Sequence, residues 1–148
     1  MNTITGIDAS APVVVRREIA VDAPLERVWR LHTDVASWPR WQPDITAAQA
    51  AGPLRVGDAF RWSTAGLDIE STVYVVEKPH RILWGGPAHG ITGVHLWTFE
   101  AAGSSVRVRT EESWDGEPVR ADAAGMRAAL DESLAAWLAH LKSAAETP

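Results

Sequence analysis

The chain has 148 residues, which suits one domain, and a net charge of −5 at pH 7 with dispersed basic residues, which argues against a nucleic-acid partner. It contains no cysteine, which excludes disulfides, thiolate nucleophiles and cysteine-ligated zinc. No apolar run approaches the ~18 residues of a membrane span, and the amino terminus lacks a signal-peptide pattern, so we expect a cytoplasmic protein.

The first part of the chain predicts one strand followed by two short helices. After an irregular start over residues 1–11, the β-branched run at 13–21 is typical of a strand. Apolar residues at helical spacing then predict a short helix over about 24–33. A second short helix is expected over 34–38, because Pro39 cannot continue it.

The middle of the chain predicts a run of antiparallel strands joined by tight turns. Residues 39–57 are rich in proline and glycine and form a loop with at most an edge strand near 45–50. Short turn signals such as Ala65-Gly66 separate the later strands. We expect these strands at about 58–64, 68–77, 80–86, 90–100 and 105–114.

The last part of the chain predicts one long amphipathic helix that begins near 115–118 and ends near 144. This order of elements indicates an α+β fold, in which the sheet buries one face against the helix. We expect a single domain over residues 1–148, with an ordered core over about 12–145. The apolar stripe of the helix consists of Val119, Ala123, Met126, Leu130, Leu134, Trp137, Leu138 and Leu141.

The expected turns also predict which side chains share a face, because directly paired residues point to the same side of a sheet. The turn at 78–79 pairs Val75 with Ile82. The turn at 102–103 places His95 opposite Thr110, so that Glu112 lies diagonal to His95.

The expected inward face is unusual for a plain core, because four of the eight tryptophans fall on it together with four polar residues. A buried histidine or carboxylate without a partner costs several kcal/mol, whereas polar groups set among aromatic rings are typical of a small-molecule pocket. The residues expected to line this pocket are Trp62, Ser71, Val73, Trp84, His95, Trp97, Thr110, Glu112 and Trp114, with Met126 and Leu130 of the long helix on the far wall.

Several motifs spread over about residues 12–145 resemble one superfamily. They are Ile19-Ala20-Val21-Asp22-Ala23-Pro24, the segment from Thr33 to Pro43, Leu54-Arg55-Val56-Gly57-Asp58, Trp97-Thr98-Phe99-Glu100, Thr110-Glu111-Glu112-Ser113-Trp114 and Trp137-Leu138. With these motifs, the chain resembles the START-like superfamily, also called SRPBCC or pollen-allergen-like, and within it the polyketide cyclase/dehydrase-type bacterial proteins.

This resemblance implies a helix-grip fold. In that fold, a curved antiparallel sheet of about six or seven strands wraps around a long C-terminal helix, two short helices follow the first strand, and a cavity lies between sheet and helix. Similar proteins include ligand carriers, cyclases and dehydratases. The resemblance carries no shared catalytic motif, so it assigns no catalytic residue.

His95 and Glu112 are the candidate catalytic residues. The pKa of histidine lies near neutrality, so His95 can serve as a general acid or base, and Glu112 can raise its basicity or act itself. The alternative is structural: His95 forms a hydrogen bond with Thr110 in the core, and Arg17 of the first strand forms a buried ion pair with Glu112.

His89 and His95 lie about 20 Å apart along a strand, which is too far for both to bind one metal ion. The sequence also shows no cofactor-binding motif. We therefore expect neither a metal nor a cofactor. The first functional hypothesis is the binding of a small hydrophobic or aromatic molecule, lipids included, in the cavity. The second is a cofactor-independent cyclase or dehydratase that acts on a polyketide-like substrate through His95 and Glu112. The sequence leaves the ligand's identity open, and also whether the protein is a monomer or a homodimer.

Overall fold

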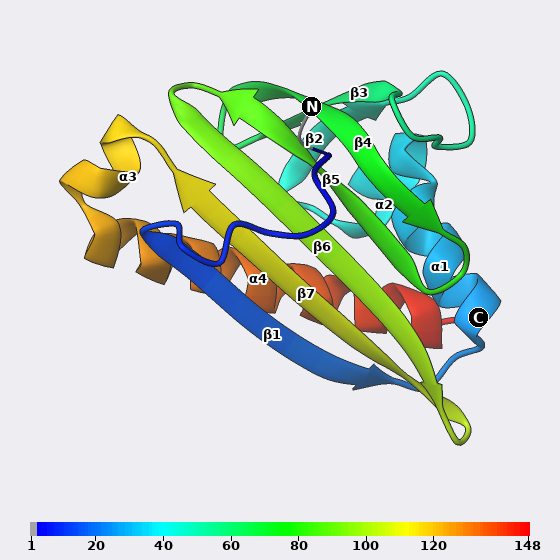
Figure 1. Ribbon diagram of the computed structural model, residues 1–148. Coiled ribbons are helices and arrows are strands. Elements are labelled where there is room, and N and C mark those ends of the chain that lie inside the picture. The colour runs from blue at the N-terminus through cyan, green and yellow to red at the C-terminus, as the bar shows by residue number, and fades with distance from the viewer. Residues whose placement is uncertain (1–2) are drawn as a thin grey trace.

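Seven segments rich in β-branched and aromatic residues pair into one antiparallel sheet that curves around a long helix (Figure 1). The computed structural model describes residues 3–148. The strand order is β1-β7-β6-β5-β4-β3-β2, which confirms the predicted α+β helix-grip fold. The strands are β1 (Val13–Val21), β2 (Ile45–Gln49), β3 (Ala59–Thr64), β4 (Leu67–Glu77), β5 (Arg81–Ala88), β6 (Ile91–Ala102) and β7 (Ser105–Asp115).

Short helices follow β1, as the sequence predicted. Helix α1 spans Leu25–Thr33, the 3-10 turn η1 spans Val35–Ser37, and α2 spans Trp38–Trp41. The helix end expected at Pro39 is wrong. Pro39 lies in the first turn of α2, where its missing N–H removes no helical hydrogen bond.

The C-terminal helix is divided at Asp122. Helix α3 covers Glu117–Ala121 and α4 covers Ala123–Glu146. Asp122 has φ −150° and ψ 64°, and its side chain accepts a hydrogen bond from the N–H of Gly125, which caps α4. The single helix expected from 115–118 onward is therefore wrong at its start. Within residues 3–148, no helix combines the length and the apolar character that a membrane crossing requires.

The β6–β7 hairpin differs from the predicted register by two residues. His95 pairs with Glu112, and Thr110 pairs with Trp97. Because side chains alternate with a period of two, a shift of two residues leaves every side chain on its expected face. The correction places Glu112 directly opposite His95 rather than diagonal to it.

A β-bulge in β4 overturns the expected position of Val75. The register shifts between Val73 and Val75, so that Val75 pairs with Leu83, and Ile82 pairs with Val76. Val75 therefore packs with Leu83 on the outer face of the sheet, whereas Val76 packs against the inner core.

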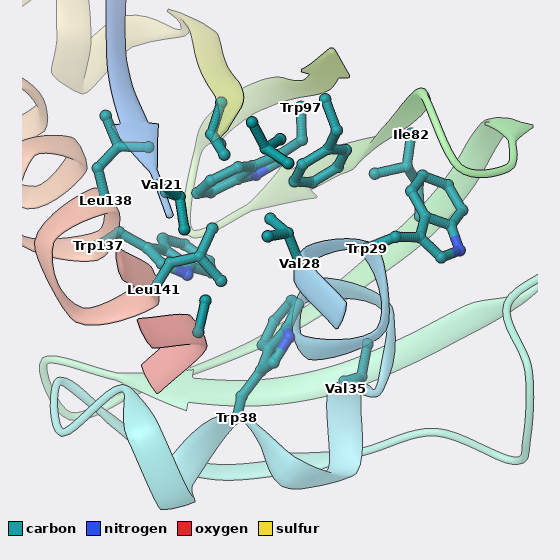
Figure 2. Packing of buried hydrophobic residues seen from close by; sticks show 14 of the residues in the cluster. Val21, Val28, Trp29, Val35, Trp38, Ile82, Trp97, Trp137, Leu138 and Leu141 are labelled. Carbon is teal, nitrogen blue, oxygen red and sulfur yellow. The ribbon is translucent and has the colours of Figure 1, made fainter. Parts of the chain in front are cut away.

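The inner face of the sheet carries two groups of buried apolar side chains. The larger group lies under α1, α2 and the C-terminal half of α4, and Figure 2 shows Val28, Trp38 and Trp137 from these helices pointing toward one another. The smaller group contains Val119 and Leu130 and lies under α3 and the N-terminal half of α4. One long helix thus covers two cores.

Residues 3–12 lie along the outer face of the sheet (Figure 1). The backbone N–H of Asp8 donates to Oγ of Ser113 over 2.9 Å. Ile7 packs against an apolar patch on this face, formed by Leu83, Val94 and Leu96. The sequence predicted an irregular start but did not predict this contact.

Candidate functional site

A pocket of about 310 Å³ lies between the sheet and α4, where the two groups of buried side chains meet. Trp84 and Trp137 of the larger group line one side, and Leu130 of the smaller group lines the other. Its volume is at the lower end of the range for small-molecule sites.

Exposed lining residues mark the mouth of the pocket. They are Asp44 before β2, Ala65 in the β3–β4 turn, Leu67 at the start of β4, His89 in the β5–β6 turn and Ser133 on α4. Nε2 of His89 lies 2.9 Å from the backbone oxygen of Asp68, so the two turns are joined at the rim.

Several of the residues that the sequence assigned to the pocket lie in its wall: Trp62, Ser71, Trp84, His95, Glu112, Trp114 and Leu130. Val73, Trp97, Thr110 and Met126 are not in the wall. Val73 and Trp97 point to the inner face but belong to the part of the sheet that α1 and α2 cover. On α4, the wall consists of Leu130, Ser133 and Trp137, so it begins one turn after Met126.

The sequence analysis missed the residues that give the pocket its depth. Gly86 and Gly93 are cross-strand partners on β5 and β6, and both line the pocket. A Cβ atom on Gly93 would lie 3.5 Å from the ring of Trp114 and 3.6 Å from Oε2 of Glu112. A side chain at this position would therefore occupy the pocket. Gly86 lines the pocket with its backbone only, because a Cβ atom there would point toward the hydroxyl of Tyr74, which packs on the outer face. A glycine at the inward-facing position 93 of β6 was the available signal.

The loop before β2 also contributes to the wall, which the sequence gave no reason to expect. Gln42, Asp44 and Ile45 line the pocket. Oε1 of Gln42 accepts a hydrogen bond from the backbone N–H of Asp44 over 3.0 Å, and this bond shapes the loop.

A chain of polar contacts links three side chains of the wall, those of His95, Glu112 and Trp114, to the buried Thr110 behind them. Oγ1 of Thr110 lies 2.7 Å from Nε2 of His95, and Nδ1 of His95 lies 3.2 Å from Oε1 of Glu112. Nε1 of Trp114 donates to Oε2 of Glu112 over 2.8 Å. The exposed fraction of the side chain is 15% for Glu112 but 2% for His95. Of the two ionisable members of the chain, Glu112 is therefore the one that is more accessible to a bound molecule.

Of the two alternatives for Glu112, the structure does not contain the pairing with Arg17. Arg17 forms two hydrogen bonds with the carboxylate of Asp131 on α4, at 2.7 and 2.9 Å. This pair is half-exposed and ties β1 to α4. Glu112 thus has no basic side chain against it among residues 3–148, and its partners are His95 and Trp114.

The two ionisable groups of the polar chain are both held toward their neutral forms. Burial raises the pKa of Glu112 to about 7, although the hydrogen bond from Trp114 acts in the opposite direction. Burial lowers the pKa of His95 well below its ordinary value of 6.5, and the neighbouring His32 adds to this effect. The wall thus offers a carboxyl group that can gain or lose a proton near neutral pH. No cluster of His, Asp or Glu within 3–148 is placed to hold a metal ion.

His32 of α1 is buried in the aromatic core beyond the pocket. Trp84 donates through Nε1 to its Nε2 over 3.3 Å, and its ring centroid lies 4.3 Å from that of Trp97. Burial lowers the pKa of His32 to about 3, so the ring is neutral. Its Nδ1 has no hydrogen-bond partner within residues 3–148. The ring centroid of His32 also lies 5.6 Å from that of Trp38, so both rings belong to the aromatic core rather than to the pocket wall.

Solved structures similar to this chain share its fold. The hypothetical protein jhp0584 of Helicobacter pylori has a TM-score of 0.82 and 22% identity, with 99% of each chain covered. A START superfamily protein from Mycobacterium smegmatis has a TM-score of 0.75 and 15% identity, with 90% of this chain and 97% of that chain covered.

The di-domain ARO/CYC protein BexL from the BE-7585A biosynthetic pathway is also similar. Its TM-score is 0.70 at 20% identity, and the match covers 94% of this chain and 52% of BexL, so this chain corresponds to about half of that protein. The comparison with curated proteins gave no match. Among protein families, the one described as polyketide cyclase / dehydrase and lipid transport matches residues 12–146. Since this match spans nearly the whole chain, the protein belongs to the polyketide cyclase / dehydrase and lipid transport family.

Proposed function

We propose that the protein binds a small hydrophobic or aromatic molecule in the pocket between the sheet and α4. The observation that carries this proposal is the pocket itself, about 310 Å³ in volume, with four tryptophans in its wall. They are Trp62, Trp84, Trp114 and Trp137. Apolar walls with a few polar groups are typical of small-molecule sites.

Obstruction of the pocket mouth tests this proposal. A panel of monocyclic and polycyclic aromatic compounds is screened by thermal shift, and hits are measured by isothermal titration calorimetry. Ser133→Trp places an indole at the mouth and is expected to weaken binding at least tenfold. Glu132→Trp is the matched control, because Glu132 is exposed on the same helix but does not line the pocket. The proposal fails if no compound binds, or if Ser133→Trp binds as tightly as the control.

A second candidate is a cofactor-independent enzyme of cyclase or dehydratase type. The supporting observation is that Glu112 reaches the pocket with a pKa of about 7, which suits a general acid or base near neutral pH. Both ring nitrogens of His95 are engaged by Glu112 and Thr110, so His95 orients Glu112 rather than meeting a substrate. BexL, a structural neighbour, is described as an ARO/CYC protein.

Turnover of a linear polyketide thioester analogue, followed by mass spectrometry, tests the enzyme hypothesis. Glu112→Gln is expected to reduce the rate roughly 100-fold or more, because it removes the proton donor and acceptor. His95→Asn is expected to shift the pH dependence of the rate. Unchanged turnover in a folded Glu112→Gln variant would rule out this role for Glu112.

A further inference from the structure

The carboxylates of the pocket wall face no lysine or arginine, and the only histidines in the described wall are His95 and, at the mouth, His89, whose Nε2 faces the backbone oxygen of Asp68. Among the described residues 3–148, the wall contains the carboxylates of Asp44 and Glu112 but no lysine or arginine. His95 offers no free nitrogen, because its two ring nitrogens face Glu112 and Thr110. A carboxylate or phosphate on a ligand would therefore lose water without gaining a cation, and it would be repelled by Glu112.

The tryptophans of the wall offer ring surfaces more than hydrogen-bond donors. Nε1 of Trp62 donates to Ser71 over 3.1 Å, Nε1 of Trp84 faces His32 at 3.3 Å, and Nε1 of Trp114 donates to Glu112 over 2.8 Å. These three donors are already used within the protein. Nε1 of the fourth wall tryptophan, Trp137, has no hydrogen-bond partner within residues 3–148, but it is buried rather than exposed to the pocket. An indole ring surface attracts a cation through its negative face.

Glu112 retains the capacity to accept a further hydrogen bond. Each oxygen of a carboxylate has two acceptor positions, and each oxygen of Glu112 faces one protein partner. With the proton of the neutral His95 ring on Nδ1, that ring donates to Oε1 while Thr110 donates to Nε2. This arrangement leaves the ionised form of Glu112 with donors on both oxygens and room for a third.

We propose that the ligand carries a protonated amine on a compact hydrophobic body, and that Glu112 accepts the ammonium group while the tryptophans surround the body. This inference rests on the binding function proposed above and defines the ligand class of the same pocket. It follows from charge complementarity: a wall with carboxylates, indole rings and no lysine or arginine selects a cationic group over an anionic one.

Three ligands of one shape and different charge test this inference. Naphthylmethylamine, naphthylmethanol and naphthoate are titrated into the unmodified 148-residue protein at neutral pH by isothermal titration calorimetry. We expect the amine to bind roughly tenfold more tightly than the alcohol, and naphthoate to bind most weakly. Equal affinities, or tighter binding of the alcohol or of naphthoate, would overturn the inference and leave the binding function standing. If none of the three binds, the proposed binding function fails for compact aromatic molecules, and the inference fails with it.

Two matched variants locate the ammonium group. Glu112→Gln preserves the shape of the side chain and an oxygen for Trp114, and it is expected to abolish the preference for the amine while changing the affinity for the alcohol less than about threefold. Asp44→Asn neutralises the other carboxylate of the wall and tests it as the alternative site of the ammonium group. Glu70→Gln is the control, because Glu70 is exposed on β4 and does not line the pocket, and it is expected to retain the preference. Loss of the preference in Asp44→Asn but not in Glu112→Gln would overturn the assignment to Glu112. The series on the unmodified protein tests the ligand class even if a variant is unstable.

Discussion

The position of Glu112 determines which polar chemistry the pocket can offer. Its partners lie behind it: His95 is buried and engaged on both ring nitrogens, and Trp114 donates to its second oxygen. No basic side chain of residues 3–148 compensates its charge, so burial dominates and the carboxyl group is held toward its neutral form. The ionised form of Glu112 is thus unfavourable in the pocket, and either a proton or a bound cation would neutralise its charge.

This arrangement predicts a pH-dependent stability cost. The pKa of Glu112 is raised from 4.5 to about 7, so the folded protein binds more protons than the unfolded chain between these values. The stabilisation that the folded protein gains by holding Glu112 protonated is therefore fully present below pH 4.5 and is lost as the pH rises through about 7. Glu112→Gln removes this dependence. From about pH 4 to about pH 8, the variant should gain on the order of 3 kcal/mol in unfolding free energy relative to the unmodified protein.

Urea denaturation of both proteins at several pH values measures this difference. Comparison of the two proteins cancels the opposite contribution of the buried histidines, whose lowered pKa values reduce stability as the pH falls below 6.5. Parallel stability curves for the two proteins would contradict the prediction.

The two-residue period of side chains along a strand explains why the sequence predicts which residues face inward. It does not predict which of these residues line the pocket. The β6–β7 register was wrong by two residues, yet His95 and Glu112 kept their face, because the side-chain period is two. The bulge in β4 shifts the register by one residue and moved Val75 to the other face. Turn signals in the sequence do not encode a bulge inside a strand.

The alternation of side chains also does not show how far along the sheet the pocket extends. Trp97 points to the same face as His95, but it lies under α1, where His32 packs against its ring. Only the docking of the short helices determines which inward residues become core and which become wall. The same limit applies to α4, where the wall begins at Leu130 rather than Met126.

The paired glycines of β5 and β6 predict a way to fill the pocket without damage to the fold. Gly93→Ala adds a methyl group in ordinary van der Waals contact with Trp114, and Gly93 does not have a positive φ. We expect the unfolding free energy to change by less than about 1 kcal/mol, because the strand conformation accepts alanine. Ligand affinity should fall roughly three- to tenfold, because the methyl group takes space from the ligand.

Calorimetric titration with the best ligand of the aromatic panel checks the Gly93→Ala prediction. Gly52→Ala is the control, because a Cβ atom there meets no atom within 4 Å and Gly52 does not line the pocket. Equal affinities in the two variants would show that Gly93 does not border the space that the ligand uses.

The two faces of the sheet differ in what covers them. The inner face holds the two cores and the pocket between them. The outer face carries an apolar patch at Leu83 that residues 3–12 cover, through Ile7 and the hydrogen bond from Asp8 to Ser113. Because the contacts of this cover lie on the outer face, it should affect stability but not binding.

Substitution of Ile7 by aspartate tests this separation. We expect Ile7→Asp to lower the unfolding free energy by about 1–2 kcal/mol, because it removes apolar burial and places a charge against the patch. Ile4→Asp is the matched control, since Ile4 is 39% exposed, and it should change stability by less than about 0.5 kcal/mol. Both variants should bind aromatic ligands as the unmodified protein does, as measured by titration calorimetry. A loss of affinity in Ile7→Asp alone would mean that the two faces are coupled through the strands, and that the cover on one face helps to set the shape of the pocket on the other.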